Sequence, residues 1–153
     1  MLKSAAMASP RGRVRVNLHP TREDRLHEMF IAIRPDSYIH PHKHLDKSEA
    51  FHVVYGAVDI VIFDDLGEIL EILELAAGDA QRSFYYRLSS PFYHTLVVRT
   101  DVLVVHEITN GPFVPGATLL APFAPAEDDR DRAAHYRTNL IRRIAELSGV
   151  GQL

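Results

Sequence analysis

The residues from Tyr38 to Gly56 read YIHPHKHLDKSEAFHVVYG, and two of their histidines, His42 and His44, are separated by a single residue. Successive side chains of an extended strand point to opposite faces, so these two imidazoles point the same way. A short polar bend separates them from Glu49, which opens a run of β-branched and aromatic residues. Two imidazoles and one carboxylate on neighbouring strands can converge on one point, and their donor atoms suit divalent first-row metals.

The spacing His-x-His-x4-Glu-x6-Gly resembles the first signature motif of the cupin superfamily, and Gly56 matches its closing turn glycine. Downstream, His94 matches the ligand of the second motif and Pro91 matches its proline. The glycine usually found between them is absent, and Tyr93 stands just before the histidine. The resemblance covers roughly residues 27–113 and implies one divalent metal ion, with Fe, Mn, Ni and Zn all compatible. The ligands that it implies are His42, His44, Glu49 and His94.

Within the cupins, the sequence is similar to the small WbuC-type cupin-fold metalloproteins. The segments with this similarity are Asp36–Tyr38, His42–His44, Lys47–Val53, Phe63–Asp65, Phe84–Ser89 and His106–Phe113. That family is associated with bacterial surface-polysaccharide gene neighbourhoods. The resemblance implies a metal site, and by association it makes a sugar or nucleotide-sugar derivative the leading substrate.

Length and composition limit the classes of protein to consider. A chain of 153 residues with 46% apolar residues suits one domain with a single core. A net charge of −3 argues against strong attraction to nucleic acid or anionic membranes, and the absence of cysteine excludes disulfides and thiolate chemistry. The apolar cluster at residues 5–8 is too short for a signal-peptide core. We therefore expect a cytoplasmic protein without nucleic-acid or membrane partners, and a homodimer is compatible with the sequence.

Short β-rich runs separated by turn signals predict an all-β fold, an antiparallel barrel of the jelly-roll (cupin) type that the resemblance implies. Alternation along one run predicts that Val58, Ile60 and Ile62 face one way and Asp59, Val61 and Phe63 the other. We expect a flexible leader at residues 1–10, the barrel at 11–125 and a helical extension at 126–153. In that extension, apolar residues recur every three or four positions from about Glu127, and Gly149 fits a C-terminal cap. Whether this helix packs on its own barrel or on a second subunit stays open.

Other polar residues are candidates with weaker arguments. We take His40, Tyr38 and His106 as candidates for acid–base or substrate contacts, and a packing role competes for each. Either His106 or its neighbour Glu107 could contribute one polar group to the pocket. His52 has the opposite parity to Glu49, so we expect it to face away from the metal.

Three arginines near the N-terminus admit two interpretations. Arg11, Arg13 and Arg15 alternate with other residues in a short predicted strand. They could form an anion-binding patch, but a solvated strand face is the more common cause of such a pattern, and we favour it.

Two classes of function remain open from the sequence. In the first, a metal-dependent isomerase, epimerase or oxygenase acts on a small polar molecule, because four ligands on one side of an ion leave room for substrate. In the second, a non-catalytic module binds a metal or a small ligand. A purely structural metal is less compatible, since structural sites close their coordination shell.

Overall fold

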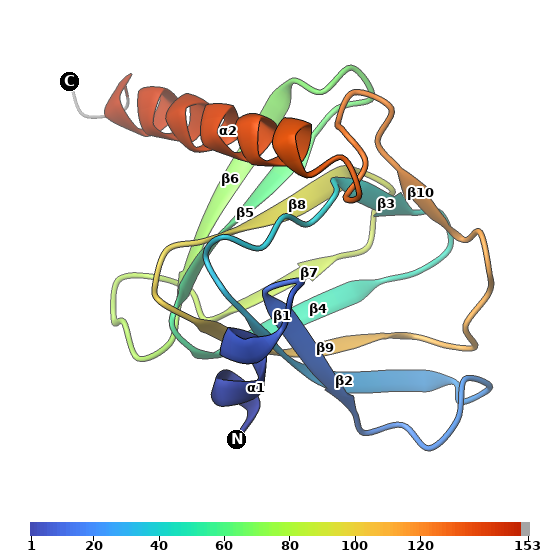
Figure 1. The fold of residues 1–153 in the computed structure, drawn as a ribbon. Helices are drawn as coiled ribbons and strands as arrows, with labels where there is room; N and C mark the ends of the chain where they lie inside the picture. Colours follow the sequence, from blue (N-terminus) through green and yellow to red (C-terminus); the bar gives the residue numbers. More distant parts are fainter. Residues whose placement is uncertain (151–153) are drawn as a thin grey trace.

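Ten strands form two antiparallel sheets within residues 1–150, the part of the chain that the computed structural model describes (Figure 1). The first sheet consists, in spatial order, of β1 (Arg13–Asn17), β2 (Leu26–Ile33), β9 (Leu103–Asn110), β4 (Glu49–Tyr55) and β7 (Tyr85–Leu88). The second consists of β10 (Thr118–Leu120), β3 (His42–His44), β8 (Tyr93–Val98), β5 (Ala57–Phe63) and β6 (Ile69–Ala76). Helices α1 (Leu2–Ala8) and α2 (Arg130–Val150) complete the fold. The predicted fold class is confirmed.

The apolar core lies between the two sheets, and strand alternation explains which residues fill it. On β5, Val58, Ile60 and Ile62 belong to the core that includes Phe51 and Val53 of β4. The next residues along β5 point to the other face of the second sheet, as alternation predicts. Both faces of β5 are therefore buried.

Helix α2 covers the outer face of the second sheet, where it lies across β5 and β6 (Figure 1). Leu140 and Ile144 of α2 are buried against Val61 and Phe63 of β5. The helix thus packs on the second sheet of its own chain in this structure. Its first turn begins after Asp129, whose carboxylate accepts a hydrogen bond from a backbone N–H of that turn.

The C-terminal end of α2 differs from the sequence-based expectation. The helix continues through Val150, so Gly149 lies within it and does not cap it. Leu147 continues the apolar periodicity of the helix in the sequence but is 52% exposed. A periodic sequence pattern cannot show where the packing partner of a helix ends.

The N-terminal residues include a helix that the sequence did not predict. Within residues 1–10, which we expected to be a flexible leader, the structure has helix α1, and its Ala6 is fully buried. Ala6 packs with Ala32 of β2 and Val104 of β9 on the outer face of the first sheet. Alanine has the highest helix propensity, and its small side chain allows the helix to approach the sheet closely.

The turn after β4 requires glycine. Gly56 has a positive φ of 87°, and a Cβ atom there would lie 2.5 Å from the carbonyl oxygen of Val102. The motif glycine therefore lets β4 turn into β5, so that the strand with Glu49 and the strand beside His94 lie in different sheets.

The proline-rich segment after β9 contributes a strand to the second sheet. Its residues Thr118–Leu120 form β10, which pairs with β3 in register, Thr118 opposite His44.

Among residues 1–150, neither helix has both the length and the apolar character needed to cross a membrane.

Candidate metal centre

The four predicted ligands come from three strands in two sheets. His42 and His44 lie on β3, and His94 lies on β8 directly opposite His42 in the ladder. Glu49 reaches the same point from β4 of the other sheet. The site therefore lies between the sheets, at the end where polar side chains replace the apolar core.

The donor atoms of these residues are close enough to share one ion. The ligand atoms of His42, His44, Glu49 and His94 all lie within 4.8 Å of one another. Glu49 Oε2 lies 3.0 Å from His94 Nε2, and Glu49 Oε1 lies 3.4 Å from His44 Nε2. The second contact is too poorly aligned for a hydrogen bond, so the buried His44 Nε2 has no partner among the described residues. A metal ion would satisfy this nitrogen, and the donor set fits such an ion.

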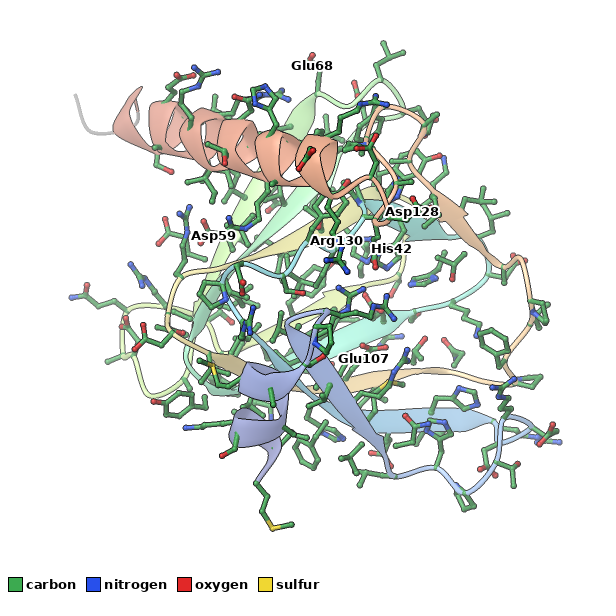
Figure 2. The ribbon with its side chains drawn as sticks, in the orientation of Figure 1. His42, Asp59, Glu68, Glu107, Asp128 and Arg130 are labelled. Carbon is green, nitrogen blue, oxygen red and sulfur yellow. The ribbon has the colours of Figure 1, made fainter. Side chains whose placement is uncertain are left out.

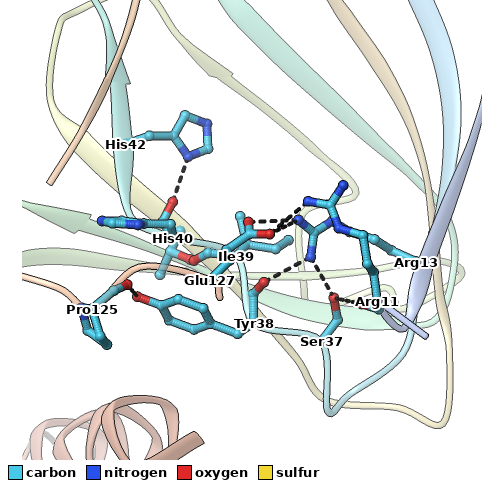
Figure 3. Close-up of polar contacts among 10 residues, drawn as sticks. Arg11, Arg13, Ser37, Tyr38, Ile39, His40, His42, Pro125 and Glu127 are labelled. Carbon is cyan, nitrogen blue, oxygen red and sulfur yellow. Dashed lines mark hydrogen bonds and ion pairs between the residues drawn. The ribbon is translucent and has the colours of Figure 1, made fainter. Parts of the chain in front are cut away.

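Each histidine of the site is held through its other ring nitrogen. His42 Nδ1 lies 2.9 Å from the carbonyl oxygen of His40 (Figure 3), and His94 Nδ1 lies 3.2 Å from that of Phe92. His44 Nδ1 lies 3.0 Å from Thr118 Oγ1. Such bonds fix the ring orientation and leave Nε2 free for a metal.

Thr118 was not among the predicted site residues, and it provides a test of this arrangement. We expect Thr118→Val to lower metal affinity by about tenfold or more, because His44 loses the bond that orients it. Titration with Zn²⁺ would measure the change. Thr138→Val, on the exposed face of α2, is the matched control and should bind like the wild type. Equal affinity in both variants would show that the Thr118 bond does not position His44.

The electrostatics of the site favour the protonation states that metal ligands need. Burial lowers the pKa of His42 to about 4, so this imidazole is neutral at neutral pH. Burial raises the pKa of Glu49, but the neighbouring imidazoles of His44 and His94 outweigh it and hold that pKa well below its usual range. Burial lowers the pKa of His94, and the hydrogen bond and charge of Glu49 overcome this, so its pKa is raised.

This raised pKa leads to a prediction about pH. A protonated His94 cannot bind a metal, so the ion must displace a proton from it. We expect metal affinity to fall as pH falls through the raised pKa, by about tenfold per pH unit for each proton displaced. Titrations with Mn²⁺ between about pH 8 and about pH 5 would measure the slope. An affinity independent of pH would show that His94 is not a ligand.

None of the three candidate catalytic residues belongs to this cluster. His40 is buried, and its Nε2 lies 2.9 Å from the carbonyl oxygen of Ala121. The Tyr38 hydroxyl donates to the carbonyl oxygen of Pro125 (Figure 3). Both side chains therefore tie the segment before β3 to the segment before α2. Pro41 interrupts the regular alternation of the strand. His40 therefore does not point into the metal cluster with His42, although the two residues have the same parity.

The third candidate, His106, belongs to the outer face of the first sheet. It lies opposite His52 in the ladder, packs against the Phe30 ring and has its Nε2 3.5 Å from Glu28 Oε1. His52 is exposed, as its parity predicts. Glu107, the next residue on β9, points to the inner face and lines the pocket beside the metal cluster, facing the second sheet that contains His42 (Figure 2).

A pocket of about 450 Å³ borders the cluster, within the size range of small-ligand sites. His44 and Glu49 form part of its wall, so one side of the cluster is accessible from it. Burial and the charge of Glu49 raise the pKa of Glu107 to about 8, although Arg15 opposes the shift. The Glu107 carboxyl therefore holds its proton more tightly than an exposed carboxyl does.

The arginines of β1 only partly form the solvated face that we favoured, because Arg15 is exposed but Arg13 is half-buried. Arg13 donates to Glu127 and to the carbonyl oxygen of Tyr38 (Figure 3). Arg15 lies opposite Ile31, which packs on the core between the sheets, so Arg15 also faces inward. Alternation defines two faces of a strand, but only the pairing with β2 decides which one is inside.

A family model described as a domain of unknown function (DUF6016) matches residues 1–75. No curated protein matches the chain.

Solved structures resemble it at low sequence identity. Oxalate decarboxylase from Bacillus subtilis superposes with a TM-score of 0.54 and 17% identity over 71% of this chain and 27% of that one. Recombinant oxalate oxidase in complex with glycolate gives 0.55 and 17%, over 75% and 58%. Procruciferin, an 11S globulin from Brassica napus, gives 0.53 and 13%, over 68% and 26%. This chain thus spans about a quarter of the decarboxylase and little more than half of the oxidase. At these identities the likeness concerns the fold alone, and the chain has the cupin fold.

Proposed function

We propose that this chain is a cupin that binds one divalent metal ion and uses it on a small polar molecule. The observation that supports this most is the convergence of three oriented imidazoles and one carboxylate beside an accessible pocket. The proposed ligands are His42, His44, Glu49 and His94. Fe, Mn, Ni and Zn all suit this donor set.

An ion held there supplies Lewis-acid chemistry, by which an oxygen of a bound molecule is polarised. The residues of this chain do the rest. His44 and Glu49 set the side from which a molecule approaches, and the core between the sheets limits entry of water. The Glu107 carboxyl faces the same pocket, where it can exchange a proton with the molecule bound there.

The finer identity of the substrate rests on the resemblance to WbuC-type proteins. On that basis we propose a sugar or nucleotide-sugar derivative of surface-polysaccharide metabolism, with isomerisation, epimerisation or oxygen-dependent oxidation as the reaction. A cytoplasmic location and a homodimer remain predictions from the sequence. The alternative is a module that binds a metal and a ligand without catalysis.

The experiment that separates these functions starts with the native metal. Metal analysis of protein purified without a histidine-tag affinity column identifies the ion. An iron-containing protein that consumes oxygen in the presence of a sugar or acid would support the enzyme. Zinc or nickel, with only a ligand-dependent shift in Tm, would support the binding module. A chain that takes up no divalent metal under any of these conditions would contradict the proposal.

A further inference from the structure

The pocket beside the metal cluster has positively charged side chains from three separate elements. Arg15 comes from β1, Arg22 from the loop between β1 and β2, and Lys47 from the loop between β3 and β4. All three line the same pocket as His44 and Glu49. Residues far apart in the sequence therefore bring cationic groups to one side of the candidate metal centre.

The orientation of Arg15 is unusual for a residue on an edge strand. Its side chain is on the inner face of β1, where its Nη1 lies 3.7 Å from the sulfur of the buried Met29. The alternate residue Val16 points outward and is 50% exposed. Arg15 is also exposed, so its guanidinium lies on the pocket side of β1 and is available to a molecule that enters the pocket.

Neighbouring groups hold these cations but do not neutralise them. The Arg22 guanidinium lies 5.7 Å from the centre of the Phe113 ring, and Lys47 Nζ donates to the carbonyl oxygen of Pro112 at 3.3 Å. In the described part of the chain, no carboxylate lies within 4.0 Å of the cationic groups of Arg15, Arg22 or Lys47. By contrast, Arg13 of the same strand is paired with a carboxylate.

A count of charges shows that the pocket attracts anions. Of the two acids in its wall, Glu49 is assigned to the metal, whose double charge it only half offsets. Even a fully ionised Glu107 would balance one of the three side-chain cations. The remaining positive charge in a concave site favours carboxylate or phosphate groups, which accept charge-assisted hydrogen bonds from guanidinium and ammonium groups.

We propose that the substrate or ligand of this site is a small anion, with an oxyanion group bound by Arg15 and Arg22 while another oxygen of the molecule faces the metal. Lys47, from the loop between β3 and β4, adds to the positive potential of the pocket. This inference rests on the proposed function for the position of the metal, but the anion-binding side chains are independent of the metal ligands. Neutral sugars would lack the group that these cations recognise.

Three two-carbon molecules of increasing negative charge test the inference: ethylene glycol, glycolate and 2-phosphoglycolate. Calorimetric titration of the metal-loaded protein should show affinity rising along this series and falling with added NaCl. Arg15→Gln should weaken glycolate and phosphoglycolate binding about tenfold, and Arg15→Gln/Arg22→Gln should weaken it further. Arg15→Lys should retain most of the affinity, because it keeps the charge.

Arg25→Gln is the matched control, since Arg25 is an exposed residue of the same region outside the pocket. It should bind all three molecules like the wild type. Equal affinity for the diol and the acids, no binding of either acid at millimolar concentration, or unchanged acid binding in the double variant would each overturn the inference. Metal content is measured in every sample. A wild type without metal would contradict the proposed function, whereas the effect of Arg15→Gln on phosphoglycolate binding can still be measured in metal-free protein.

Discussion

Replacing Glu49 by alanine is expected to abolish stoichiometric metal binding while leaving the fold largely intact. Glu49 is the one carboxylate of the four donors, it is buried, and it reaches the site from the sheet opposite the histidines. Losing a charged partner in a buried site typically costs about 3–5 kcal/mol, which corresponds to at least about a hundredfold in affinity. His44→Ala should have the same result, because its buried Nε2 has no other described partner. Elemental analysis gives the metal content, and circular dichroism checks the fold.

His52→Ala is the matched control for this experiment. His52 lies on the same strand as Glu49, but it is exposed on the outer face and packs its ring against Phe84. Its removal should leave metal content near that of the wild type. A Glu49→Ala protein with a full equivalent of metal, or a His52→Ala protein without it, would show that the site has been assigned to the wrong face of β4.

The second large effect concerns the attachment of α2. We expect Phe63→Ala to lower the free energy of unfolding by about 3–5 kcal/mol, because the change leaves a cavity where relaxation is limited. Phe63 is fully buried and packs against the Phe123 ring, with centroids 5.5 Å apart, in the cluster that includes Leu140 of α2. Since domains of this size are stable by about 5–15 kcal/mol, this is a large fraction of the total. Urea denaturation followed by circular dichroism would measure it.

Phe92→Ala serves as the control. Phe92 is 44% exposed and lies immediately before β8, which begins at Tyr93. We expect it to change the free energy of unfolding by less than about 1 kcal/mol. If Phe63→Ala unfolded at the same urea concentration as the control, the contact between α2 and the second sheet would contribute little to stability. The helix would then be a separable extension.

Much of the fold could be predicted because the relevant signals are local. Alternation within β5 assigns Ile60 and Val61 to opposite faces, and the structure places them in two different clusters. The same period of two puts His42 and His44 on one face of β3. Strand β6 shows the limit of propensity, since Ile69–Ala76 pairs as a strand although its leucines and glutamates favour a helix.

Other features depend on contacts that no local pattern records. Helix α1 forms where Ala6 meets the outer face of the first sheet, and this surface exists only after β2 and β9 have paired. The role of Thr118 in holding His44 follows from the pairing of β10 with β3, which are separated by more than seventy residues. Sequence periodicity therefore had no means of finding either contact.

The spacing of His42, His44 and Glu49 is enough to predict a strand-borne donor set and a sheet fold, because side-chain direction along a strand follows from backbone geometry alone. The direction in which the Arg15 side chain points does not follow from its own strand alone. Its strand has two chemically plausible faces, and only the long-range register with β2 turns the arginine toward the pocket and the valine toward solvent. Inside and outside are properties of the assembled sheets, so the charge of the pocket emerges only when the strands are paired.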